Sequence, residues 1–350
     1  MDDQRQQGDA SRMSAGLTRR QMLTTGALTA AAVAFPSVGG RLTSTARRTE
    51  RSERKGRMSK LRLLGVLAMA LAASGTAQAT APGKNGLILF LRHVGPREQI
   101  FTARLDGTHM RQLTHFTDSA AADASWSADS RRVAFARDYD CCDPKKEHLD
   151  IYTMNADGTG LHGMGLKGLN GGPVWFPDGR RILFGHPGGL WVVPAAGGTP
   201  HRVLRIVGDF ESPALSPNGQ KVVFVRNKAN GSALFVADLA TAVAKQITPW
   251  SLRAKPKVDW APDGALLLSR TEDGRIFTIR PDGSALRILI KGADYCSDSF
   301  SPDGTKVLYI DHCSMGGVKS HLFTMNLDGT GVKQVPHLIG HWVSWGSATG

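Results

Sequence analysis

The chain has 350 residues, of which 41% are hydrophobic, 7% aromatic and 21% charged. This is the composition of a globular protein, and it excludes collagen, a coiled coil and a fully disordered chain. The formal net charge is +13, but residues 1–57 alone contain eleven basic and five acidic residues. The other basic residues are spread thinly and do not alternate with aromatic ones, so nucleic acid is not an expected partner.

Residues 1–57 are predicted to form a disordered, Arg-rich leader. Arg19 and Arg20 precede a mildly apolar run that ends at Val38, and this arrangement resembles a twin-arginine export signal. The rest of the leader has no apolar periodicity, so it is not expected to fold. One explanation for this extra segment is that translation begins at Met58, where a second signal starts.

Residues 58–79 have the layout of a Sec-type signal peptide. A basic start is followed by the apolar stretch 63–73 and by the small-residue sequence Ala77-Gln78-Ala79. We expect cleavage after Ala79, which leaves a periplasmic or secreted protein. The apolar stretch is short for a hydrocarbon core of about 30 Å, so no permanent membrane span is expected after cleavage.

From Asn85 onward two sequence phrases alternate, at steps of 40 to 49 residues. The first phrase, typified by Ser299-Phe-Ser-Pro-Asp-Gly-Thr-Lys-Val-Leu-Tyr, has a bulky apolar anchor before its turn. The anchors are Trp126, Trp175, Leu215, Trp260, Phe300 and, in a final half copy, Trp345. The second phrase ends in a turn such as Asp-Gly-Thr and has an aromatic residue at one fixed position. These aromatic residues are Phe101, Tyr152, Trp191, Phe235, Phe277 and Phe323.

Each phrase predicts a β-hairpin, because an apolar strand enters a Pro-Asp-Gly or Asp-Gly turn and a second apolar strand returns. Two hairpins make one four-stranded propeller blade. The first strands, in 85–92, lack a preceding partner, and the last half copy, 341–346, lacks a following one. The sequence therefore predicts an all-β fold over residues 80–350, a six-bladed β-propeller. One C-terminal strand and three N-terminal strands share a blade and close the ring.

The recurring phrases S-P-D-G-x-x-[VI]-x-[FY] and [IL]-[FY]-x-x-x-x-D-G-[TS] closely resemble the repeats of TolB-type propellers. TolB is the periplasmic translocation protein of the Tol-Pal system, so the resemblance implies a propeller that acts in the cell envelope. TolB also carries an α/β domain before its propeller, whereas only Thr80 to Lys84 separate the predicted signal from the first blade here. Prolyl oligopeptidase-like enzymes have similar propellers, but their G-x-S-x-G motif is absent from this sequence.

Four cysteines belong to the exported part and are candidates for disulfide bonds. Cys296 and Cys313 flank one predicted hairpin, and a bond between them would stabilise the protein by about 3 kcal/mol. Cys141 and Cys142 are adjacent. A vicinal disulfide, two free thiols and an intermolecular bond all stay open for them.

The predicted working surface is the mouth of the central channel, where the loops that lead into the innermost strands lie. These loops contribute residues of mixed charge, which suit an envelope protein, a peptide or a polar small ligand. The candidate residues are Asp123, Asn170, Glu211, Lys255, Lys257, Tyr295, Asp298, His341 and Trp342. No nucleophile and base pair can be assigned among them, so we expect a monomeric, non-catalytic binding scaffold.

The alternative is a propeller enzyme, such as a lactonase or a saccharide lyase or hydrolase, with a metal-assisted site in the channel. No cofactor is predicted from the sequence, because the eleven histidines show no compact metal-binding spacing. A propeller nevertheless assembles its sites from distant blades. A divalent metal in the channel would require at least three His, Asp or Glu side chains to converge at one mouth, for instance from His341, Glu211, Asp123 and Asp298.

Overall fold

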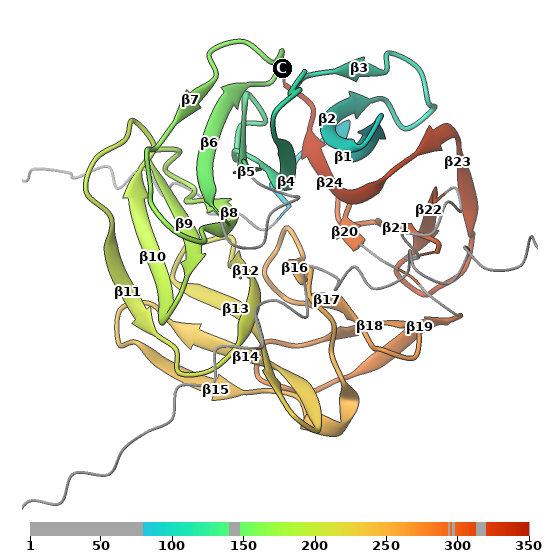
Figure 1. The fold of residues 1–350 in the computed structure, drawn as a ribbon. Coiled ribbons are helices and arrows are strands. Elements are labelled where there is room, and N and C mark those ends of the chain that lie inside the picture. Colours follow the sequence, from blue (N-terminus) through green and yellow to red (C-terminus); the bar gives the residue numbers. More distant parts are fainter. Residues whose placement is uncertain (1–79, 140–147, 293–294, 296–297, 313–319, 350) are drawn as a thin grey trace, which may run out of the picture. The chain divides into compact units, whose positions relative to one another are not determined.

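A computed structural model describes residues 80–139, 148–292, 295, 298–312 and 320–349. These residues form six four-stranded antiparallel sheets arranged as blades around a central axis (Figure 1). The predicted six-bladed β-propeller is therefore confirmed. Among the described residues, no helix is long and apolar enough to cross a membrane.

In every blade the strands follow one another from the centre outward (Figure 1). The first three blades are built from β24 (His341–Ser347), β1 (Asn85–Val94), β2 (Arg97–Ala103) and β3 (Arg111–Gln112); β4 (Ala120–Trp126), β5 (Arg132–Asp138), β6 (Leu149–Asn155) and β7 (His162–Gly163); and β8 (Gly171–Trp175), β9 (Arg181–His186), β10 (Gly189–Pro194) and β11 (His201–Arg205).

The fourth blade also carries a short 3-10 helix after its outermost strand. The last three blades are built from β12 (Phe210–Leu215), β13 (Lys221–Lys228), β14 (Gly231–Asp238), β15 (Val243–Gln246) and η1 (Trp250–Leu252); β16 (Asp259–Trp260), β17 (Leu267–Arg270), β18 (Arg275–Ile279) and β19 (Arg287–Lys291); and β20 (Asp298–Phe300), β21 (Lys306–Ile310), β22 (His321–Asn326) and β23 (Lys333–Ile339).

The first blade closes the ring as predicted, because β24 pairs with β1 in antiparallel register. Phe90 lies opposite Val343, and Ile88 lies opposite Trp345. At the end of this ladder the backbone amide of Ala348 donates a hydrogen bond of 2.7 Å to the carbonyl of Lys84. The two ends of the propeller chain are therefore joined in one blade. In the described ring every innermost strand is paired with the second strand of its blade.

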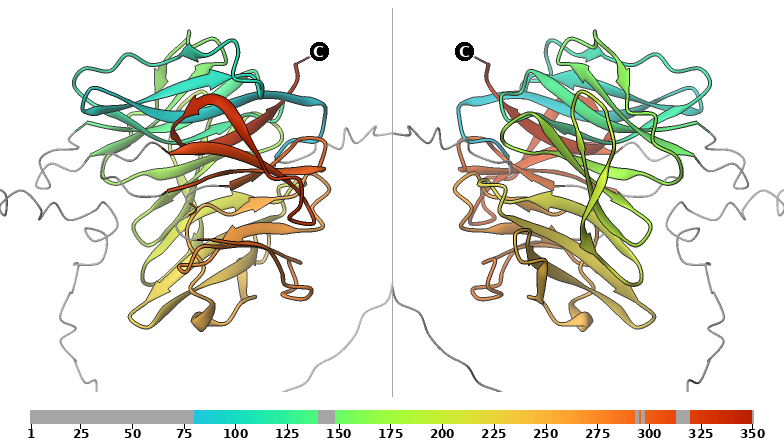
Figure 2. Two further views of the ribbon diagram at one scale, coloured as in Figure 1. Left: turned by 90° about the vertical axis from the view of Figure 1, so that its right-hand side faces the viewer. Right: turned by 90° about the vertical axis from the view of Figure 1, so that its left-hand side faces the viewer.

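Each hydrophobic core lies between two neighbouring blades. The cluster between the fourth and fifth blades, for example, contains Val223, Trp260 and Phe277. The anchors predicted from the repeats are almost fully buried: Trp126, Trp175, Leu215, Trp260, Phe300 and Trp345. One blade cannot cover both of its own faces, so the hydrophobic effect stabilises the stack and the ring together. The side views in Figure 2 show the blades stacked around the axis.

The outer hairpins depend on turn chemistry, as the Asp-Gly motifs predict. Asp106 accepts hydrogen bonds from the backbone amide and the hydroxyl of Thr108, at 2.9 and 2.6 Å. Gly107 between them has φ +80°, and a Cβ atom there would lie 2.2 Å from the carbonyl oxygen of Pro336. Only glycine fits this turn, since the neighbouring chain approaches its backbone so closely.

All four cysteines lie outside the described residues, so the disulfide between Cys296 and Cys313 stays a prediction. The same holds for the leader and the signal peptide in residues 1–79.

Candidate functional site

The innermost strands share a backbone irregularity three residues before the anchor. In five blades the residue at this position has positive φ, between 50° and 71°; these residues are Asp123, Gly172, Ser212, Lys257 and Trp342. The ladder to the second strand is interrupted there, for example between Ala122 and Ser125, as in a β-bulge. Position 297, the equivalent in the sixth blade, lies outside the described residues.

These five residues all line one cavity of about 80 Å³ on the axis of the ring. Every blade contributes to its wall, since Ser299 of the sixth blade also lines it. A cavity of this size holds a few water molecules. A larger ligand does not fit inside it. The mouth, by which we mean the end of the channel where the innermost strands begin, is the place where the sequence predicts that such a ligand binds.

The cavity is narrowed by the segment that precedes the first blade. Thr80 and Ala81 line it, and Thr80 is 7% exposed. Its hydroxyl donates a hydrogen bond of 2.7 Å to Oδ2 of Asp259. Thr80 is also the residue that would follow the predicted cleavage after Ala79, so cleavage there would leave the new N-terminus inside the channel.

Asp259 connects the N-terminal segment with two blades. Besides Thr80, its Oδ2 accepts hydrogen bonds from the hydroxyl of Ser299 at 3.1 Å and from the backbone amide of Phe300 at 2.8 Å. Its Oδ1 accepts one from the amide of Trp260 at 2.9 Å. A buried carboxylate with this many donors holds its surroundings in one arrangement.

Three further charged residues, Asp298, Arg270 and Lys257, lie near Asp259. Oδ1 of Asp298 lies 3.9 Å from the guanidinium of Arg270, and both side chains are at least 95% buried. The carboxylate oxygens of Asp298 have no hydrogen-bond partner among the described residues, and burial raises its pKa to about 7. Burial also lowers the pKa of Lys257, and the carboxylates of Asp259, Asp298 and Asp123 oppose this effect.

The predicted mouth residues fall into two groups. Asp123, Lys257 and Trp342 line the cavity, and Lys257 Nζ lies 5.2 Å from the ring centroid of Trp342. Oδ2 of Asp123 accepts a hydrogen bond from the amide of Gly172 at 3.0 Å. These three residues thus offer a carboxyl group, an amine and an aromatic surface at one place.

The other predicted residues do not line the cavity and have partners of their own. Asn170 is 2% exposed and bonds to the carbonyl of Leu149. Glu211 accepts a hydrogen bond from Asn227, Lys255 pairs with Glu272, and Tyr295 packs against Tyr309 with ring centroids 5.1 Å apart. Asp298 lies beside Arg270, as described above.

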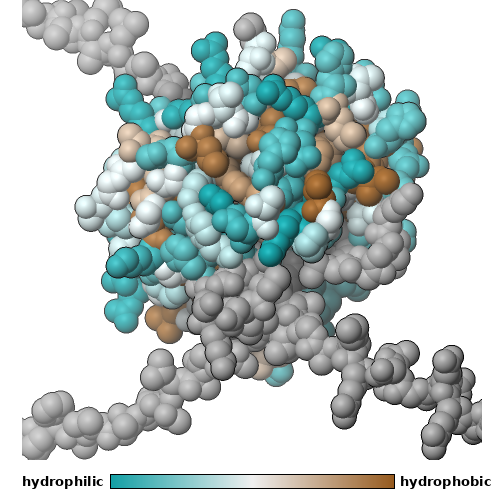
Figure 3. All heavy atoms as spheres, turned by 45° about the horizontal axis from the view of Figure 1, so that its top comes forward, coloured by the Kyte–Doolittle hydropathy of each residue, from teal (hydrophilic) through white to brown (hydrophobic). Residues whose placement is uncertain are grey.

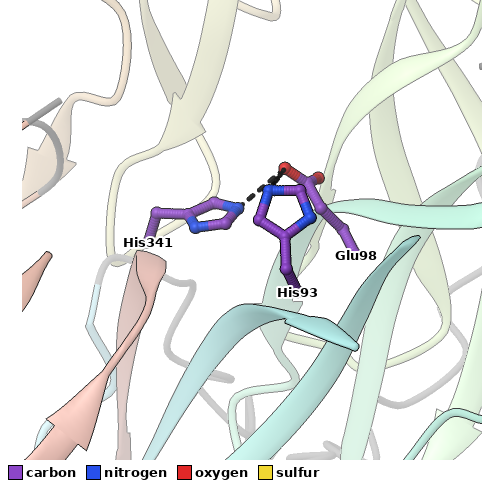
Figure 4. A group of neighbouring side chains, drawn as sticks. All are labelled: His93, Glu98 and His341. Atoms are coloured by element: carbon purple, nitrogen blue, oxygen red, sulfur yellow. Dashed lines mark hydrogen bonds and ion pairs between the residues drawn. The ribbon is translucent and has the colours of Figure 1, made fainter. Parts of the chain in front are cut away.

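His341 meets two residues that the sequence did not point to, His93 and Glu98 (Figure 4). Its Nε2 lies 2.7 Å from Oε1 of Glu98, and Nε2 of His93 lies 3.9 Å from the same oxygen. One ligand atom from each residue lies within 4.8 Å of the other two. Three such side chains, which the enzyme alternative requires, therefore lie together, but His93 and Glu98 stand in place of Glu211, Asp123 and Asp298.

Large exposed hydrophobic residues do not form a cluster in these blades. They are Val94, Met110, Leu161, Val207, Val243, Leu286 and Val332, spread over several strands and loops. On the face shown in Figure 3, brown hydrophobic residues lie among teal and white ones.

No family model matches the chain. A TolB homologue of Chlorobium luteolum is 26% identical over 203 residues, which cover 56% of this chain and 45% of that protein. An uncharacterised protein of Agrobacterium fabrum is 34% identical over 114 residues, 30% of this chain and 36% of that protein. The chain thus spans less than half the length of these curated relatives.

Solved structures agree with these similarities. TolB from Acinetobacter baumannii has a TM-score of 0.64 and 20% identity, with 77% of this chain and 68% of that chain covered. A TolB-type protein from Agrobacterium tumefaciens has a TM-score of 0.54 and 17% identity, with 76% and 99% covered. The chain therefore carries a TolB-like β-propeller.

Proposed function

We propose that this protein is a non-catalytic binding scaffold of the cell envelope that recognises a protein, a peptide or a polar small ligand at the mouth of its channel. The observation that carries this proposal is the set of cavity-lining residues three positions before five of the six anchors. The fold imposes the same backbone conformation on these blades, but the side chains differ: an acid, a glycine, a serine, a lysine and a tryptophan. Such a ring offers varied contacts on a rigid frame.

The likeness to TolB supports a binding role by analogy of fold. A fold alone does not determine function, so the proposal rests on the residues of the site. The predicted Sec-type signal in residues 58–79 supports a periplasmic or secreted location. A monomer agrees with the closed ring, which leaves no innermost edge for a second copy.

Site-specific photo-crosslinking in the cell envelope tests this proposal. We expect p-benzoylphenylalanine in place of Trp342 to yield crosslinked adducts, because this half-buried side chain lies at the mouth. The matched control replaces Asn218, an exposed residue in the hairpin turn after β12, at the opposite end of the channel. Adducts from position 218 alone, or equal adducts from both positions, would contradict a binding surface at the mouth.

The second candidate function is the propeller enzyme with a metal-assisted site. It is favoured by one observation, the convergence of His93, Glu98 and His341 at the start of β24. Its test is turnover of lactones and of uronate-containing oligosaccharides, with and without a chelator. Turnover that the chelator abolishes would favour this candidate over the scaffold.

A further inference from the structure

Three side chains on three adjacent strands of the first blade have the composition of a transition-metal site. His93 on β1 lies directly opposite Glu98 on β2 in the antiparallel register. His341 begins β24 and lies opposite Leu91, two residues before His93 on β1. Residues two apart in a strand point to the same face, so the ladder brings the three side chains together without any loop.

The distances between the ligand atoms suit a tetrahedral ion. Bonds of about 2.0–2.2 Å to nitrogen and oxygen place two ligand atoms of a tetrahedral zinc site roughly 3.4 Å apart. The separations of 2.7 Å for His341 to Glu98 and 3.9 Å for His93 to Glu98 lie on either side of this value. Small side-chain rotations are enough to equalise them, since the backbone is held by the sheet.

The burial of the three groups leaves one side open. The side chain of Glu98 is 15% exposed, that of His341 30% and that of His93 53%. Three protein ligands with access to solvent are the arrangement in which zinc keeps a fourth position for water or for a ligand. A purely structural role does not require His93, which is the most exposed of the three.

We propose that His93, Glu98 and His341 bind a divalent transition-metal ion of the Zn²⁺ class at the mouth of the channel. Imidazole and carboxylate together suit zinc and its neighbours, whereas Ca²⁺ and Mg²⁺ prefer all-oxygen sites. The open position of the bound ion faces solvent and accepts an anionic or imidazole group of a ligand. This inference holds for either candidate function, because it concerns the ion and not a reaction.

Titration calorimetry with Zn²⁺ on the purified exported protein tests the site. We expect one ion per chain at pH 7.5, and no stoichiometric binding in the presence of an excess of a chelator. His93→Ala and Glu98→Gln are each expected to weaken binding by at least about 100-fold. His201→Ala is the matched control, since His201 is an exposed histidine of the third blade, and it should leave the affinity unchanged.

The variants must also be separable from misfolding. Loss of His93 removes a half-exposed ring, so the unfolding midpoint without metal should not change. Glu98→Gln keeps the shape of the side chain and can still pair with His341. Absence of stoichiometric zinc binding at pH 7.5, or zinc binding of wild-type strength in the two folded variants, would overturn the proposal. Equal loss in His201→Ala would do so too.

Discussion

A chain that ends at Gly340, and therefore lacks β24, is expected to lose its cooperative unfolding transition. Removing this strand deletes the buried Val343 and Trp345 and uncovers Ile88 and Phe90, which pack with them in one core. Burial of each large apolar side chain contributes about 1.5–3 kcal/mol. The loss is therefore comparable to the whole stability of a domain, roughly 5–15 kcal/mol.

A circular permutant supplies the matched control for this truncation. The ends of the ladder lie together, since the amide of Ala348 bonds to the carbonyl of Lys84. A permutant that begins at His341 and joins Thr349 to Lys84 through a short linker keeps all strands of the first blade. The truncated chain compared with it also begins at Lys84, so both lack the hydrogen bond of Thr80 to Asp259. We expect urea unfolding to be cooperative for the permutant and absent or strongly weakened for the truncated chain. A truncated chain that unfolds like the full protein would show that β24 is dispensable.

Replacing Asp259 by Ala is expected to destabilise the protein by about 2–4 kcal/mol, because the buried amide of Phe300 and the hydroxyls of Thr80 and Ser299 lose their acceptor. Most of this cost is the penalty for leaving buried donors without a partner. Asp259→Asn keeps one acceptor oxygen and should lie between the wild type and the Ala variant.

The matched control for Asp259 is Asp263→Ala, four residues further along the same blade. Asp263 is exposed and accepts a hydrogen bond from the amide of Ala265 in its turn. Its replacement should cost well under half as much in the free energy of unfolding, measured by urea denaturation. Equal losses for the two Ala variants would mean that the hydrogen bonds of the buried Asp259 stabilise the protein no more than those of an exposed turn residue.

The fold could be predicted from the sequence because the same two hairpin motifs recur from blade to blade. The anchors at Trp175 and Phe300, with a Pro-Asp-Gly turn after each, define the first hairpin of a blade. The unmatched half repeats at the two ends required β24 to pair with β1. Both inferences rest on local patterns and on the need to cover sheet edges, and neither requires a knowledge of side-chain positions.

The site was harder to predict, because it depends on β-bulges at positions that have no residue type in common. Asp123, Lys257 and Trp342 turn into the cavity since each lies three residues before an anchor in a positive-φ conformation. Such a conformation is usual for glycine and rare for lysine or tryptophan. Asn170, Glu211 and Lys255 lie one or two residues earlier in their repeats, and their side chains have other partners.

The cluster of His93, Glu98 and His341 was missed for a related reason. His341 is far from His93 and Glu98 in the chain, and only the pairing of β24 with β1 brings it to them. A signal was present, because His93 and Glu98 are symmetric about the hairpin turn at Gly95-Pro96. Cross-strand pairs at a hairpin can be read from a sequence once the turn is placed.

Amide hydrogen exchange of β24 measures ring closure, on which the whole site depends. His341 and Trp342 belong to this strand, so the mouth exists only if the strand is paired. We predict that the amides of the strand that bond to β1 exchange with the same protection as those of β13 and β14 in the fourth blade, because all are lost only in global unfolding. Rapid exchange in β24 alongside full protection of β13 and β14 would contradict a ring closed by the two ends of the chain.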